Sequence, residues 1–175
     1  MKLASVAVAF AAIAVAGCAN MHMPSDGPKA TAKLEPTKGN NVTGDATFTQ
    51  KGSRVAVAGE VRGLQPNKEH GFHVHEKGDC SSGDGMSAGG HFNPQGVAHG
   101  NHAMGTHHAG DMPNMKADAN GVAVIAWEDD VLTVTDGSTT VVGRALIVHR
   151  DPDDYKSQPA GNSGPRLACG VITKS

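Results

Sequence analysis

The sequence has few aromatic residues and no cluster of basic ones. Phe, Trp and Tyr together make up 3% of its 175 residues, whereas glycine occurs 23 times. This combination favours short strands joined by long, turn-rich loops over a helical bundle. The formal net charge is −2 with neutral histidines, and no run of Lys or Arg occurs. Both features argue against nucleic-acid binding.

The chain also lacks an apolar run long enough to span a bilayer. Its longest run, Leu3–Ala16, is shorter than the roughly 20 residues that a transmembrane helix needs. Because Lys2 precedes this run and small residues follow it, we interpret residues 1–17 as a signal peptide that is removed on export.

Only three cysteines occur, and an odd number in an exported chain requires an explanation. Residues 14–16 form an A-x-A site for ordinary signal peptidase. Residues 15–18 resemble the bacterial lipobox, in which cleavage precedes a cysteine that is then acylated. We favour the lipobox, which places a lipid on Cys18 and allows Cys80 and Cys169 to pair in an oxidising periplasm. The alternative is that Cys18 leaves with the signal peptide or stays unmodified.

The remaining chain divides into a short tether and one domain. Residues 18–28 have no periodicity and end in turn formers, which is typical of a flexible linker. Their Met21-His22-Met23 sequence is either a weak copper contact or a chance feature of that linker, and we favour the second interpretation. Residues 29–175 show no internal repeat and are predicted to form a single domain.

Alternation of apolar and polar residues predicts strands in this domain. Such segments occur at residues 42–49, 55–61, 122–127 and 141–149. Helical periodicity is hard to find after residue 18. We therefore predict an all-β fold, an antiparallel sandwich or barrel with two long loops at about 77–117 and 150–168. Loops of this length are usually functional.

Ten histidines are unusual in such a chain, and most lie between His70 and His108. His73 and His75 would project from the same face of a strand, which is a natural start for a copper or zinc site. A second apolar stretch ends on His149, which would add a third imidazole from a neighbouring strand.

The glycine-rich loop adds a second set of ligand-type residues, namely His91, His99, His108 and Asp111. Three imidazoles and a carboxylate match the tetrahedral N and O preference of zinc. A loop with so little apolar content needs such an ion to order it. Any one of these histidines alone would be interpreted as a solvated side chain, and their density favours a metal site.

Four blocks in order make the sequence similar to the copper/zinc superoxide dismutase family. They are GFHVHEKGDC (71–80), GGHFNP (89–94), HAGD (108–111) and GNSGPRLACGVI (161–172). The similarity extends from about Val42 to Ile172. It implies a Greek-key antiparallel β-sandwich or flattened barrel, and an enzyme that converts superoxide to dioxygen and hydrogen peroxide.

The resemblance also implies a role for each candidate residue. The implied copper ligands are His73, His75, His91 and His149. The implied zinc ligands are His91, His99, His108 and Asp111, so His91 bridges the two ions and also donates a proton. Asp153 would link a copper histidine to a zinc histidine, and Cys80 would pair with Cys169. Arg166 would guide the superoxide anion. Because the protein is net negative, attraction of an anion must be local, and Lys156 is a weaker candidate for it.

Three histidines have no ligand role in this scheme. His107 lies next to His108, and the HAGD spacing favours His108 as the ligand. His102 and His107 are interpreted as surface residues or as helpers in metal recruitment. His70 is interpreted as structural.

Three other functions fit part of the pattern. A noncatalytic metal-buffering lipoprotein would not need Arg166 or Asp153. A zinc hydrolase needs an open zinc position, which four protein ligands would close. A structural β-sandwich with surface histidines would bind no metal stoichiometrically.

We therefore predict a periplasmic enzyme that protects the cell envelope from superoxide. Its lipid on Cys18 would hold it at the outer membrane, because Ala19 stands where inner-membrane lipoproteins often carry Asp. The family includes homodimers and monomers, and the sequence does not choose between them.

Overall fold

The computed structural model describes residues 27–175, so the predicted signal peptide, Cys18 and most of the tether lie outside the described residues. Within this part the elements are β1 (Lys29–Pro36), β2 (Thr43–Lys51), β3 (Arg54–Arg62), β4 (Glu69–His70), β5 (Phe72–His75), η1 (Met86–Ala88), β6 (Met115–Lys116), β7 (Ala123–Asp129), β8 (Ala145–His149) and β9 (Arg166–Lys174). The only helical element among them is the single 3-10 turn η1. The predicted all-β class is confirmed, and no helix within residues 27–175 is long and apolar enough to cross a membrane.

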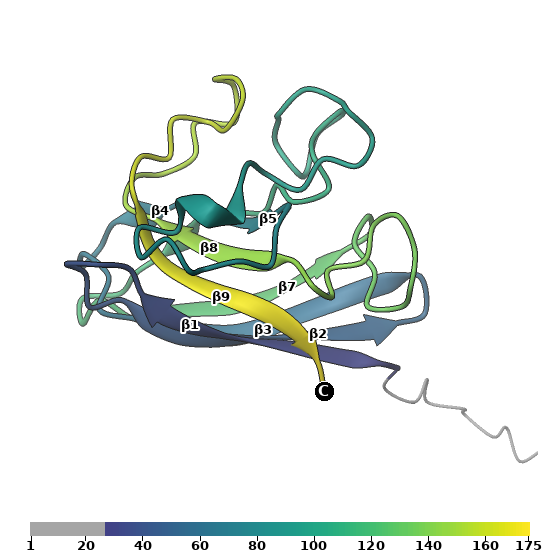
Figure 1. The fold of residues 1–175 in the computed structure, drawn as a ribbon. Helices are drawn as coiled ribbons and strands as arrows, with labels where there is room; N and C mark the ends of the chain where they lie inside the picture. The colour runs from purple at the N-terminus through teal and green to yellow at the C-terminus, as the bar shows by residue number, and fades with distance from the viewer. Residues whose placement is uncertain (1–26) are drawn as a thin grey trace, which may run out of the picture.

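Seven strands form one curled antiparallel sheet in the order β5-β8-β9-β1-β2-β3-β7, and β4 pairs separately with β6. In Figure 1, β5, β8 and β9 form a layer over β1, β2, β3 and β7. Three of the predicted segments correspond to β2, β3 and β7, whereas the fourth contributes only its final five residues as β8. The sequence analysis did not name β1, which joins the two layers by pairing with β2 and β9.

The core lies between these layers and is built by alternation along the strands. Ala30, Ala32 and Leu34 alternate with more exposed residues along β1 and are buried in it. Phe72 and Val74 on β5 belong to the same cluster, because alternate side chains of a strand point to opposite faces. Each large apolar side chain buried in this way contributes about 1.5–3 kcal/mol relative to leaving it exposed.

Two long connections lie on the same side of the sheet. Residues 76–114 join β5 to β6, and residues 150–165 join β8 to β9. Both loops rise beyond β5 and β8 at the top of Figure 1. The disulfide between Cys80 and Cys169, with Cα atoms 5.8 Å apart, ties the first loop to β9. The loops are therefore placed where the histidines of β5 and β8 project.

Candidate metal centre

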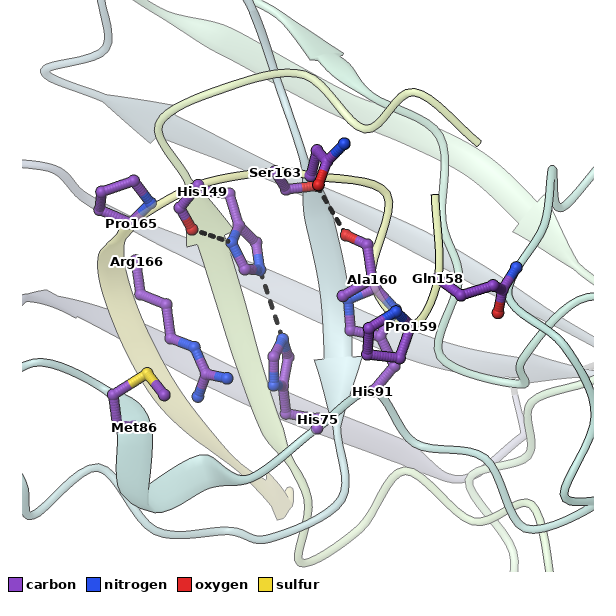
Figure 2. A pocket seen from close by; sticks show the side chains of 13 residues that line it. His75, Met86, His91, His149, Gln158, Pro159, Ala160, Ser163, Pro165 and Arg166 are labelled. Carbon is purple, nitrogen blue, oxygen red and sulfur yellow. Dashed lines mark hydrogen bonds between the residues drawn. The ribbon is translucent and has the colours of Figure 1, made fainter. Parts of the chain in front are cut away.

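The strands supply three histidines to one point. His73 and His75 lie on β5, and β8 pairs antiparallel with β5 before ending at His149. Figure 2 shows the His75 and His149 rings directed at each other, with their Nε2 atoms 3.3 Å apart. The two ring centroids are 5.5 Å apart and the rings are stacked.

His91 from the first loop completes this group, which we call the four-histidine group: His73, His75, His91 and His149. Each residue offers one ring nitrogen, and these four atoms lie within 4.8 Å of one another. The far nitrogens of the strand histidines are held by fixed acceptors. His75 Nδ1 donates to the Gly89 carbonyl at 2.9 Å, and His149 Nδ1 donates to the Gly164 carbonyl at 3.2 Å. These bonds select the tautomer that directs Nε2 inward.

The second group, which we call the three-histidine–aspartate group, comprises His91, His99, His108 and Asp111. It centres on Asp111 Oδ1, which lies 2.8 Å from His91 Nδ1, 3.0 Å from His99 Nδ1 and 3.4 Å from His108 Nδ1. The other carboxylate oxygen accepts the backbone N–H groups of Gly100 at 3.1 Å and His108 at 2.8 Å. Asp111 therefore orients the group from its centre.

Asp153 connects the two groups from the second loop. Its Oδ2 accepts His73 Nε2 at 2.9 Å and its Oδ1 accepts His99 Nε2 at 3.0 Å. The Asn114 side chain bonds both the N–H and the C=O of Asp153, at 2.8 and 2.9 Å. Gly161 has φ +61, and a Cβ at that position would collide with the Asp153 carboxylate. Only glycine fits there without displacing this link.

Burial and hydrogen bonding set the charges of the two groups. Burial lowers the pKa of His73 to about 4 and the pKa values of His75 and His149 well below 6.5, so these imidazoles are neutral at pH 7. Neutral imidazole is the form that binds metals. Burial alone would raise the pKa of Asp111, but hydrogen bonds from His91 and His99 hold it well below its usual range.

Hydrogen bonds also outweigh burial in setting the pKa values of Asp153 and of its partner His99. Burial would raise the pKa of Asp153, but hydrogen bonds from His73 and His99 lower it. For His99, burial lowers the pKa, and the hydrogen bonds to Asp111 and Asp153 outweigh it and raise the pKa to about 9. In the metal-free state His99 therefore carries a proton that a metal would displace.

Unpartnered nitrogens test whether these groups suit metal ions. His73 Nδ1, His91 Nε2 and His108 Nδ1 are buried and have no hydrogen-bond partner. Leaving a buried polar atom unpaired costs about 1–3 kcal/mol. All three belong to residues of the two groups, where an ion would satisfy them. The donor sets fit a closed site with one carboxylate and a second, all-imidazole site.

The four-histidine group opens to solvent through a cavity of about 280 Å³. His75, His91, His149 and Arg166 line it, with Met86 at its edge (Figure 2). The Arg166 guanidinium donates to the carbonyls of Gly85 and Gly89, each at 2.6 Å. Arg166 thus lies beside the group.

The remaining predicted residues have separate positions. Lys156 lines a different cavity, beside His99 and Tyr155, and does not line the one that contains Arg166. His70 is buried and its Nδ1 donates to the His149 carbonyl at 3.0 Å, which is a structural role. Neither His102 nor His107 enters a ligand group within the described part of the chain. His102 lies near Trp127 and Tyr155, and His107 Nδ1 donates to the His108 carbonyl at 2.8 Å.

Sequence reasoning missed Asn114, which positions Asp153, and Thr37, whose hydroxyl donates to the Arg166 carbonyl at 2.7 Å. No local pattern marks either residue, because both contacts join segments far apart in the sequence.

Known proteins are similar to this chain along most of its length. A family model described as copper/zinc superoxide dismutase matches residues 42–172. The chain is 43% identical over 148 residues to copper/zinc superoxide dismutase 2 of Aquifex aeolicus, covering 82% of this chain and 86% of that protein. It is 40% identical over 149 residues to an extracellular copper/zinc superoxide dismutase of Drosophila melanogaster, covering 79% and 81%. Among solved structures, the clock protein EA4 matches with a TM-score of 0.76 and 40% identity, covering 87% of this chain and 99% of that one.

Proposed function

The chain belongs to the copper/zinc superoxide dismutase family, and from this premise we propose which residues hold each metal and where the enzyme works. Membership makes the protein an enzyme that converts superoxide to dioxygen and hydrogen peroxide with copper and zinc as cofactors. The predicted enzyme class is confirmed, and the comparisons favour it over metal buffering, zinc hydrolysis and a purely structural role.

We assign copper to the four-histidine group and zinc to the three-histidine–aspartate group. One contrast carries this assignment: the two groups share His91 but differ in their donor sets and in their access to the cavity. The group with a carboxylate has four protein ligands and little access, which suits a structural zinc. The all-imidazole group borders the open cavity, where an anion can reach a redox ion.

When bound, copper supplies a one-electron redox couple, which zinc lacks. The residues of the chain supply orientation and protons. We propose that His91 carries at Nε2 a proton that the forming peroxide needs, because this nitrogen is buried and has no other partner. The Asp153 carboxylate holds the His73 and His99 rings in fixed orientations while His91 gains and donates its proton.

Arg166 is proposed to guide the anion to this position. Two of its guanidinium nitrogens are occupied by the Gly85 and Gly89 carbonyls, which fixes the side chain at the cavity wall. A fixed positive charge in a cleft raises the local concentration of an anionic substrate.

We further propose that the enzyme works in the bacterial cell envelope, in the periplasm and anchored to the outer membrane by a lipid on Cys18. The signal-like residues 1–17 and the lipobox support this location. The Cys80–Cys169 disulfide supports an oxidising compartment. The role of the enzyme in this compartment would be to protect the envelope from superoxide. Whether the chain forms a homodimer stays a prediction that analytical ultracentrifugation tests.

The dependence of the activity on copper is tested by comparing the purified protein loaded with copper and zinc against the same protein loaded with zinc alone. We expect fast dismutation only with copper present. Equal activity in both samples, or stoichiometric copper binding without turnover, would overturn the proposal. For the anchor, we expect cells fed labelled palmitate to label the wild-type protein and not Cys18→Ser. Equal labelling, or none in either, would refute the lipid on Cys18.

A further inference from the structure

A second cavity adjoins the one that leads to the four-histidine group. Its volume is about 290 Å³, and Lys38 and Asp84 contribute to its lining. Met86, Pro165 and Arg166 line both cavities. The two cavities therefore share a wall at Arg166, and an anion that approaches Arg166 from the second cavity lies near Lys38 and Asp84.

The turn between β1 and β2 holds Lys38 in this place. The pairing of β1 with β9 brings Pro36 opposite Ala168, so the turn that follows lies beside Arg166. The Thr37 hydroxyl donates to the Arg166 carbonyl at 2.7 Å. The Lys38 N–H donates to the Gly83 carbonyl at 2.6 Å, which also joins the turn to the first loop. The backbone of Lys38 is thus fixed relative to Arg166.

Asp84 is fixed on the other side of the same cavity. Its Oδ1 accepts the Ser82 hydroxyl at 2.7 Å and the Met86 N–H at 2.9 Å. The next residue, Gly85, accepts one of the Arg166 guanidinium bonds. A negative charge therefore lies one residue from an Arg166 contact.

We propose that Lys38 and Asp84 tune the capture of superoxide with opposite signs, Lys38 accelerating and Asp84 slowing its arrival at Arg166. Apart from histidines, these three residues are the only ionisable side chains that line the two cavities in the described part of the chain. The protein as a whole is negatively charged, so attraction of an anion must come from local charges. This inference rests on the proposed approach of superoxide past Arg166.

The test measures kcat/KM of the copper- and zinc-loaded enzyme by pulse radiolysis at increasing ionic strength. We expect Lys38→Gln to lower the rate about twofold at low salt and Asp84→Asn to raise it by about the same factor, with both differences closing as salt screens the charges. Lys38→Arg keeps the charge and should retain the wild-type rate. Asparagine at position 84 keeps an Oδ1 that accepts both hydrogen bonds.

Lys116→Gln and Asp118→Asn serve as matched controls, because they change the net charge equally and line neither cavity. Azide binding to the copper-loaded protein, followed by its absorbance, gives an equilibrium measure of the same local field. We expect a larger dissociation constant for azide in Lys38→Gln and a smaller one in Asp84→Asn.

Changes equal to those of the controls, or changes that persist at high salt, would overturn the inference. Arg166→Gln separates it from the proposed function. If that variant loses rate while the Lys38 and Asp84 variants match their controls, only the inference fails. If Arg166→Gln keeps the wild-type rate, the proposed approach path fails as well.

Discussion

The sheet and the two long loops hold their interiors together by different means. The sheet has an apolar interior, with Phe48 and Phe72 fully buried, and its backbone groups pair in the strand ladders. The loops at 76–114 and 150–165 instead enclose imidazoles and two carboxylates. Polar groups of this kind repay their burial only when each has a partner. The comparison indicates that the loops depend on ions where the sheet depends on packing.

The two ligand groups follow this division. Three members of the four-histidine group, His73, His75 and His149, come from strands β5 and β8. Every member of the three-histidine–aspartate group comes from the first loop. Losing copper should therefore remove activity and leave the fold in place, whereas losing zinc should loosen the loop and lower stability.

The largest expected effect comes from His149→Ala on the strand side. Activity should fall by more than about 100-fold, because even the loss of an outer partner of a metal ligand costs 10–100-fold. Zinc content, measured by mass spectrometry of the metals, should stay at the wild-type level. His102→Ala is the control, since His102 belongs to neither group. Loss of zinc together with activity would contradict the division between sheet and loops.

Asp111→Asn tests the loop side of the comparison. Removing the central carboxylate should release zinc, and with it a stabilisation of about 4 kcal/mol at a free zinc concentration 1,000 times the dissociation constant. For a domain of this size, that corresponds to a fall of roughly 8–16 °C in Tm. Calorimetry with zinc present measures the shift. Asp118→Asn makes the same charge change in an exposed turn, and an equal fall in that variant would refute the specific role of Asp111.

The ligand residues on the strands could be predicted from the sequence more directly than those in the loop. The alternation of Phe72 and Val74 with two histidines predicts which side chains face the core, because the period of a strand is fixed. The loop histidines carry no such period, so only their density and the presence of Asp111 favoured a metal site, and the role of each came from the family resemblance. The structure brings the predicted members of both groups together, and the assignment of a metal to each group stays a proposal.

Other features had no local signal. Strand β1 was not named because Ala30 and Ala32 supply its buried face, and alanine is a weak indicator of strands. The place of Lys38 beside Arg166 depends on the register of β1 against β9, which no short pattern encodes. Lys156, named as a weaker contributor to guiding the anion, instead lines the cavity beside His99. Long loops make sequence distance a poor guide to spatial distance.

Asp153→Asn tests how strongly the four-histidine group and the three-histidine–aspartate group are coupled. The amide would present a donor to one of two ring N–H groups that both need an acceptor, at His73 and His99. We expect affinity for zinc to fall 10–100-fold, with a smaller loss of copper affinity, because β5 holds His73 independently. Competition with a chromophoric chelator measures both. Asp154→Asn next to it is the control, and an unchanged zinc affinity in Asp153→Asn would show that the two groups bind independently.

The smallest expected effect concerns a buried carboxyl at the end of the sheet. Burial raises the pKa of Asp129, and the backbone N–H groups of Val131 and Leu132 only partly offset it. The nearby ionisable groups are Asp130, which raises this pKa, and His107, which lowers it, with His102 also in range. Asp129 thus contrasts with Asp111 and Asp153 in the loops, whose imidazole partners lower their pKa values.

Because the folded pKa of Asp129 is raised, the protonated folded state is favoured at low pH, and this stability is lost as pH rises through the folded pKa. Asp129→Asn removes the charge and keeps an Oδ1 acceptor for both N–H groups. Its Tm should therefore exceed that of the wild type by about 1–3 °C near neutral pH, and the difference should close towards pH 4. Metal release at low pH affects both proteins equally and cancels in the difference. A gap that is constant with pH, or of opposite sign, would mean that ionised Asp129 is stabilised at the sheet end as fully as the loop carboxylates are.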